Sequence, residues 1–162
     1  MPRTKKIILG VDPGLADTGY GLIKKVGADL KIIDYGVIKT KPKTPEELRL
    51  LDINQSINKL IKKYRPEIVA VEKLFFSKNV KTASSVGQAR GVILLAVGQN
   101  KLELLEFTPL QVKQALTGYG QASKKQVQYM IKTILRLPAP PKSDDAADAL
   151  AIAICAANWL KR

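Results

Sequence analysis

The sequence has no histidine among its 162 residues. This absence excludes a Ser-His-Asp triad, a Cys-His pair, a histidine general base and a histidine-ligated zinc ion. The single cysteine, Cys155, cannot form an internal disulfide, and its apolar neighbours predict a position in the core. If the protein is a hydrolase, the water is therefore best activated by a metal held by carboxylates, the ligands that suit Mg²⁺ or Mn²⁺.

Long apolar runs are also missing. No run approaches the ~18–20 residues that a membrane-spanning helix needs. The basic segment 1–6 resembles the start of a signal peptide, but only five apolar residues follow it, which is too few. We therefore expect a cytoplasmic protein with no membrane partner.

Acidic residues are few compared with basic ones. The chain has 14 Asp and Glu against 27 Lys and Arg, a formal net charge of +13, while 46% of its residues are hydrophobic. This composition predicts one globular domain over residues 1–162. The positive charge indicates a polyanionic partner, with nucleic acid the first expectation and an anionic membrane surface the second.

Hydrophobic periodicity predicts a mixed α/β protein. Short apolar runs predict strands at residues 6–12, 18–26, 31–40, 67–73 and 102–107. Three- and four-residue spacing predicts helices from 44 to just before Pro66, at 80–99, 108–116 and 123–137, and from 144 onward. Thr44 and Glu47 predict a capping box for the first helix. The order of elements predicts a mixed five-stranded sheet flanked by helices.

Four carboxylates are placed where a metal site would form. Asp12 and Glu72 each end an apolar strand, and the two strands are expected to be parallel neighbours. In open α/β sheets, ligands bind at the carboxyl ends of such strands. Asp145 and Asp148 stand three residues apart at the head of an alanine-rich helix, so both side chains can face that edge. Acids on a cationic protein predict metal-dependent cleavage of a polyanion.

Each acid taken alone has a simpler interpretation. Asp12 begins the turn-like sequence Asp-Pro-Gly, and Glu72 also fits an exposed strand end. Asp144 and Asp145 fit the capping of a helix, which is the favoured interpretation for Asp144. Capping explains Asp148 poorly because it lies one turn further into the helix. A single metal site accounts for the four positions together.

Several motifs resemble those of the bacterial RuvC Holliday junction resolvases, in order and over nearly the whole chain. They are Ile8-Leu9-Gly10-Val11-Asp12-Pro13-Gly14, Thr18-Gly19-Tyr20-Gly21, Val71-Glu72 with Phe75, Gly87-Gln88-Ala89-Arg90-Gly91, Val112-Lys113-Gln114 and Asp145-Ala146-Ala147-Asp148-Ala149-Leu150-Ala151. The resemblance implies a ribonuclease H-like fold and a homodimer that nicks two opposing strands of four-way junction DNA. It also implies 5′-phosphate and 3′-hydroxyl ends, and a branch-migration helicase complex of the RuvA and RuvB type as partner.

The same resemblance assigns roles to individual residues. It implies that Asp12, Glu72, Asp145 and Asp148 bind metal, with two Mg²⁺ expected per active site and Mn²⁺ as a substitute. Some family members have histidine where this chain has Asp148, and some carry a longer C-terminal tail than this chain has.

Basic and aromatic positions extend the predicted site toward DNA. Lys113 and Lys124 match family positions implicated in cleavage, and Phe75 matches an aromatic that meets unstacked bases. Solvated lysines and a core phenylalanine are the alternatives. Weaker predictions of contacts to the DNA backbone fall on six further residues: Lys78, Lys81, Arg90, Lys125, Lys132 and Arg136.

Small residues follow one stripe of the helix predicted at 80–99, with Gly87 and Gly91 among them. The family resemblance makes this helix the expected dimer contact, although packing within one protomer also fits. Three other functions fit parts of the sequence. They are an actin-like or sugar-kinase-like ATP-binding domain, a ribonuclease H-like nuclease acting on ribosomal RNA precursors, and a junction-binding protein without catalysis. The first would need a second domain and a second phosphate loop.

Overall fold

The computed structural model describes residues 4–73 and 80–160 and contains a five-stranded sheet in the order β3-β2-β1-β4-β5. Three antiparallel strands lead the chain, and two later strands extend the sheet in parallel with the first. The predicted mixed sheet is confirmed. The strands are β1 (Lys5–Asp12), β2 (Asp17–Val26), β3 (Asp29–Lys39), β4 (Ile68–Glu72) and β5 (Glu103–Phe107).

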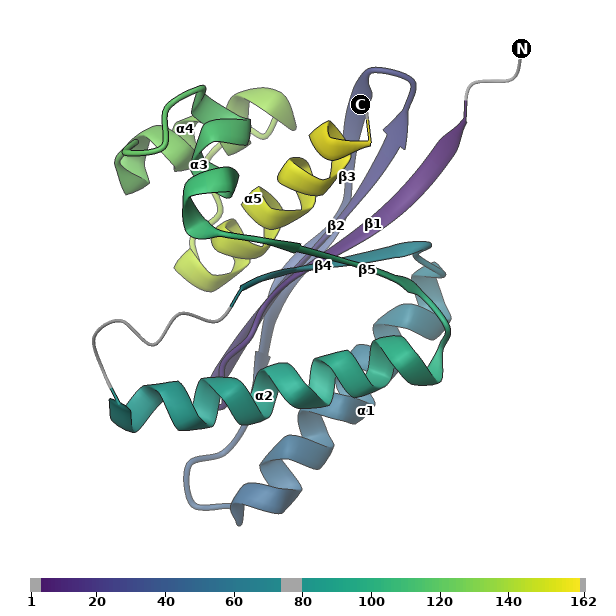
Figure 1. Cartoon of the computed structure of the whole chain (residues 1–162), viewed down its shortest axis with the longest axis vertical. Coiled ribbons are helices and arrows are strands. Elements are labelled where there is room, and N and C mark those ends of the chain that lie inside the picture. Colours follow the sequence, from purple (N-terminus) through teal and green to yellow (C-terminus); the bar gives the residue numbers. More distant parts are fainter. Residues whose placement is uncertain (1–3, 74–79, 161–162) are drawn as a thin grey trace.

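Helices cover both faces of the sheet (Figure 1). One face packs against α1 (Glu46–Tyr64) and α2 (Val80–Gln99), around a core that includes Ile53, Ile57 and Ile93. The other face packs against α3 (Pro109–Thr117), α4 (Lys124–Ile134) and α5 (Asp144–Trp159). The central strand β1 contributes alternate residues to the two cores, with Ile8 on the α5 side and Leu9 on the α1 side.

Close contact between α5 and the sheet fixes the position of the last helix. Gly10 in β1 and Gly19 and Gly21 in β2 all face α5, and a Cβ atom on any of them would overlap atoms of that helix. Alanines make up much of the buried face of α5. Small residues on both sides therefore bring the helix backbone against the two strands that carry and adjoin Asp12.

Three local predictions need correction. The capping box at Thr44 is wrong: its backbone N–H closes a turn onto the Lys41 carbonyl, Pro45 is extended (ψ 142°), and α1 begins at Glu46 without a side-chain cap. The fourth helix ends at Ile134 rather than 137, because the chain leaves helical geometry and Arg136 takes a φ of 53°.

The third correction concerns the start of α5. The side chain of Ser143 accepts the Ala146 N–H and is the N-cap, so Asp144 is not the capping residue. Thr108 and Ser123 are the N-caps of α3 and α4, and each forms a capping box, with Gln111 and Gln126 respectively. No helix in the described part of the chain is long and apolar enough to cross a membrane.

Candidate active site

Asp12 and Glu72 lie at the carboxyl ends of adjacent parallel strands, as predicted. In the β1–β4 register Val11 pairs with Val71, so the two acids follow at the same edge of the sheet. In both strands the four residues before the acid are buried, and the acid itself is partly exposed. The parallel pairing of β1 and β4 therefore places two carboxylates at one edge of the sheet.

The amino end of α5 brings two more carboxylates to this edge. Asp145 and Asp148 belong to its first turns, and α5 crosses the sheet over β1 and β2. All three other acids act on Asp12, whose pKa rises from an ordinary value of 3.8 to about 8. Burial is the largest cause, followed by the negative charges of Asp148, Asp145 and Glu72 and a hydrogen bond with Asp145. The four predicted acids are thus brought together in one electrostatic cluster.

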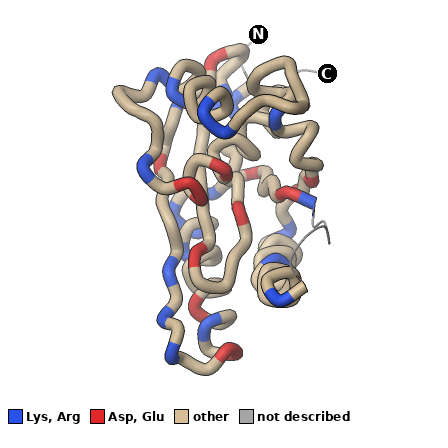
Figure 2. Tube along the Cα trace, turned by 90° about the vertical axis from the view of Figure 1, so that its left-hand side faces the viewer, with Lys and Arg blue, Asp and Glu red and all other residues tan. Residues whose placement is uncertain are grey.

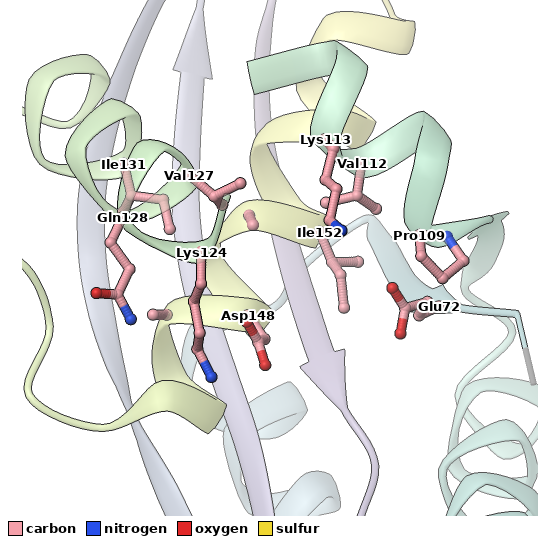
Figure 3. A pocket seen from close by; sticks show the side chains of 12 residues that line it. Glu72, Pro109, Val112, Lys113, Lys124, Val127, Gln128, Ile131, Asp148 and Ile152 are labelled. Carbon is pink, nitrogen blue, oxygen red and sulfur yellow. The ribbon is translucent and has the colours of Figure 1, made fainter. Parts of the chain in front are cut away.

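A pocket of about 240 Å³ opens beside this cluster (Figure 3). Glu72 and Lys113 line one side of it, and Asp148 and Lys124 line the other. Burial and the charge of Asp148 raise the pKa of Glu72, while Lys113 opposes that rise. Burial likewise raises the pKa of Asp148, and Lys124 opposes it. Each lysine therefore lies close enough to one acid of the cluster to stabilise its charge.

Lys124 is held by an acid outside the cluster. Its Nζ lies 2.9 Å from an Oδ2 of Asp144, and both side chains are more than half exposed. Gln128 also donates to Asp144, at 3.0 Å. The hydrogen bond to Asp144 is the main cause of the raised pKa of Lys124. Asp144 thus positions Lys124 at the pocket mouth, a role that the sequence did not reveal because the partners are twenty residues apart.

Arg90 in α2 contacts the end of β4, the strand that presents Glu72. Its guanidinium forms an ion pair with Glu106 in β5, and its Nε donates to the Glu72 carbonyl oxygen at 3.4 Å. The side chain is 16% exposed, so most of it is occupied within the protein. Arg90 therefore joins α2, β4 and β5 behind Glu72. The sequence does not predict this role, although Arg90 belongs to the Gly87–Gly91 motif.

The donor set fits hard divalent cations. Four carboxylates converge, and burial followed by the negative charges of the other three acids raises the pKa of Asp12, a cost to its charged form that a bound cation would relieve. Within residues 4–73 and 80–160, no three acid or cysteine side chains stand close enough together to form a finished coordination sphere. The residues therefore fit a metal by type and by location, and their side chains have to adjust to coordinate it.

The weaker predictions are spread more widely. Lys81 lies exposed in the first turn of α2, Lys125 lies exposed in α4, and Lys132 and Arg136 lie further along α4 and just beyond it. None of these four lines the pocket beside Asp148. Phe75 and Lys78 lie outside the described residues.

A family comparison identifies the chain. The model of the family "Crossover junction endodeoxyribonuclease RuvC" matches residues 8–156. The chain belongs to the RuvC family. A RuvC of Halothermothrix orenii is 59% identical over 152 residues, covering 94% of this chain and 92% of the relative. A RuvC of Desulforamulus reducens is 54% identical over 153 residues, covering 94% of each. The family consists of metal-dependent nucleases.

Solved structures agree with this assignment. The fold is similar to Thermus thermophilus RuvC in complex with a Holliday junction substrate, with a TM-score of 0.92, 36% identity, and coverage of 96% of this chain and 95% of that one. The yeast mitochondrial Holliday junction resolvase Ydc2 shares the fold at a TM-score of 0.69 and 16% identity, covering 95% of this chain and 78% of that one. The predicted ribonuclease H-like fold of the RuvC type is confirmed.

Proposed function

We propose that this protein, acting as one nuclease domain over residues 1–162, resolves Holliday junctions by symmetric paired nicks during DNA recombination and repair in the cytoplasm. The observation that carries the proposal is the convergence of four acids from β1, β4 and α5 beside a pocket lined by Lys113 and Lys124. Membership of the RuvC family supplies the reaction class, crossover junction endodeoxyribonuclease.

The acids and the lysines have different roles in phosphodiester hydrolysis. Asp12, Glu72, Asp145 and Asp148 would hold two Mg²⁺ ions, for which Mn²⁺ could substitute, and the bound metal would supply an activated water and stabilise the leaving oxygen. Lys113 and Lys124 approach the pocket from α3 and from the start of α4 and bind the phosphate oxygens there. The products carry 5′-phosphate and 3′-hydroxyl ends.

Junction cleavage by paired nicks requires two active sites. We propose a homodimer through α2, because its outer face carries Leu95 at 56% exposure and glycines where an added Cβ atom would touch nothing within 4 Å. A helix face with an exposed leucine and small residues suits close packing of a symmetric partner. Phe75 meets unstacked bases at the crossover, and a helicase complex of the RuvA and RuvB type is the assembly partner.

Two of the alternatives are disfavoured by specific observations. An ATP-binding domain of the actin or sugar-kinase type would not need acids from α5 beside Asp12, and a non-catalytic junction binder would gain nothing from the repulsion among them. A ribosomal RNA nuclease would use the same site chemistry, so the substrate separates it from a resolvase. The sequence relatives at 54–59% identity favour the resolvase.

One experiment tests the proposal directly. The protein is incubated with a synthetic four-way junction, a linear duplex of the same sequence and a structured RNA, each with Mg²⁺, with Ca²⁺ and with EDTA. We expect paired nicks in the junction with Mg²⁺ and binding with little cutting in Ca²⁺, whose longer metal–oxygen distances of roughly 2.3–2.6 Å suit the reaction poorly. Equal cutting of the linear duplex, or cutting in EDTA, would contradict the proposal.

A further inference from the structure

A groove separate from the catalytic pocket lies on the opposite side of α4. It has a volume of about 520 Å³, and Tyr119, Lys125 and Tyr129 are among the residues that line it. Tyr119 is 57% exposed and Tyr129 is 63% exposed, which are large fractions for aromatic side chains. Two uncovered rings and a lysine thus border one hollow, and neither ring has a role in the catalytic site.

The groove and the catalytic pocket share one helix. Val127, Gln128 and Ile131 line the catalytic pocket, whereas Gln126, Tyr129 and Met130 line the groove. At the start of α4, Lys124 belongs to the pocket and its neighbour Lys125 to the groove. The pocket and the groove therefore lie on opposite faces of α4 and are joined at its amino end by the adjacent lysines Lys124 and Lys125.

Charge on this part of the chain suits a polyanion. Residues 107–143 contain no Asp or Glu but carry six basic residues, Lys113, Lys124, Lys125, Lys132, Arg136 and Lys142. Figure 2 turns the side of the molecule that carries α4 in Figure 1 toward the viewer, with basic and acidic positions coloured. None of the residues that line the groove is acidic, whereas Glu72 and Asp148 line the catalytic pocket and Asp144 is paired with Lys124. Repulsion of phosphate is therefore confined to the catalytic pocket side.

The turn before α4 holds Tyr119 outward. Gly118 takes a φ of +74° and ends α3, and the Thr117 hydroxyl accepts the Tyr119 N–H at 3.1 Å. On the other side of the turn, Gly120 packs against Leu110, where a Cβ atom would lie 2.9 Å from Cγ. The backbone around Tyr119 is thus fixed before any ligand arrives, which lowers the entropic cost of binding.

We propose that this groove binds an unpaired nucleotide of the cleaved DNA strand, with its base against Tyr119 and Tyr129 and its phosphate on Lys125. This inference rests on the proposed function, because it needs a strand in the catalytic pocket. Exposed aromatic faces with a neighbouring cation are the combination that binds single-stranded nucleic acid, since any base can stack on them. A base inside a duplex would not present its face to the rings.

Photo-crosslinking tests the contact itself. The probe is a four-way junction whose cleaved strand carries 5-iodouracil at one position at a time, on either side of the cut, bound in Ca²⁺ so that it stays intact. We expect crosslinks to Tyr119 or Tyr129 at one or two adjacent positions, and their loss in the double variant Tyr119→Ser/Tyr129→Ser. Crosslinks spread evenly over all positions, or none to either tyrosine, would overturn the proposal.

Binding measurements give a second, independent result. The double serine variant should bind the junction about five- to hundred-fold more weakly, the range expected from loss of base stacking, while its cutting rate at saturation stays within about twofold. Tyr119→Phe/Tyr129→Phe keeps the stacking faces and should bind like wild type, which controls for folding. Tyr35→Ser, at an exposed tyrosine in β3, is the matched surface control and should change nothing.

The results separate this inference from the proposed function. If wild type cuts the junction but the double serine variant binds it equally well, the groove does not bind DNA and a protein partner becomes its better occupant. If wild type leaves the junction uncut in Mg²⁺, the proposed function fails, and the crosslinking pattern in Ca²⁺ still decides whether the groove contacts a strand.

Discussion

The backbone of Asp145 occupies the space that a Cβ atom on Gly19 would need. Gly19 also lies opposite Asp12 in the β1–β2 register. One glycine therefore sets the separation between the strand that carries Asp12 and the helix that carries Asp145. This explains physically why a glycine stands at this point of the Thr18-Gly19 motif.

Gly19→Ala should damage both the fold and the site. A methyl group there would meet the Asp145 carbonyl group and come within 3.0 Å of the Ala146 nitrogen, so α5 has to move away from β2. Overpacking of this kind costs about 1–3 kcal/mol of unfolding free energy. We expect a lower melting temperature and loss of junction cutting, measured by thermal unfolding and by nicking assays. Gly98→Ala, where a Cβ atom meets nothing within 4 Å in the protomer, is the folding control and should not lower the melting temperature.

Asp12→Asn should abolish cutting and preserve junction binding, because it removes a metal ligand but no positive charge. It should also stabilise the metal-free protein. The Asp12 pKa is about 8 in the folded state against an ordinary 3.8, so the folded state binds the proton more tightly and wild-type stability falls as pH rises from about 4 to 8. The asparagine side chain does not ionise, so the variant does not lose stability in this way as pH rises.

The stability difference is measured by melting both proteins without metal across this pH range. The variant should melt increasingly above wild type up to about pH 8, with no further divergence from this group above it. Added Mg²⁺ should raise the melting temperature of wild type more than that of the variant. Equal melting at pH 8, or full cutting by Asp12→Asn, would refute the assignment of Asp12 to the charged cluster.

Substitution of Arg90 tests whether this residue positions Glu72 or contacts the DNA directly. Its partners are the Glu72 carbonyl oxygen and the Glu106 carboxylate, so Arg90→Gln should loosen the strand end that presents Glu72. We expect the cutting rate at saturating junction to fall by roughly 10- to 100-fold and the Mg²⁺ requirement to rise, with affinity nearly unchanged. Glu106→Gln should act in the same direction and Arg90→Lys should recover part of the rate.

A contact between Arg90 and the DNA backbone would give the opposite pattern. Affinity would fall, its salt dependence would become shallower, and the rate at saturation would stay close to wild type. Titrating Mg²⁺ against the cutting rate separates the two, since a lost phosphate contact does not change the metal requirement.

Gly91→Phe should weaken self-association without unfolding the protomer. Gly91 is exposed on α2, and a side chain added there meets nothing within 4 Å in the protomer. If α2 forms the dimer contact, a bulky ring holds the partner helices apart. Analytical ultracentrifugation should show more monomer and nicking assays should show unpaired nicks. If the variant sediments like wild type, α2 does not form the dimer interface.

The sequence predicted the features that depend on local pattern. Buried strands ended in Asp12 and Glu72, and helical spacing put Asp145 and Asp148 on one turn, so the topology alone brought the four acids to one edge. Thr44 misled because Pro45 takes a ψ of 142° and itself occupies the N-cap position, so α1 starts at Glu46, whereas the same Thr-Pro pair at Thr108-Pro109 does cap α3. Capping signals compete locally, and the winner depends on the preceding turn.

Other features depend on elements far apart in the chain. The pairing of Arg90 with Glu106 and of Lys124 with Asp144 joins different elements, and no spacing rule relates such partners. The two tyrosines that line the groove are ten positions apart, one in the turn before α4 and one within α4, so no helical or strand spacing relates them. Side-chain partners of this kind follow from tertiary packing rather than from pattern.

The burial of Cys155 has a practical consequence for following the protein as it works. Burial raises the pKa of its thiol to about 11, so at neutral pH hardly any thiolate is present to react. No second cysteine occurs in the chain. A cysteine introduced at exposed Leu48 in α1, away from the proposed dimer face, would therefore be the one position that a maleimide fluorophore labels quickly, with Cys155 left in place. Energy transfer between two such dyes would report how protomers meet and separate on a junction in real time.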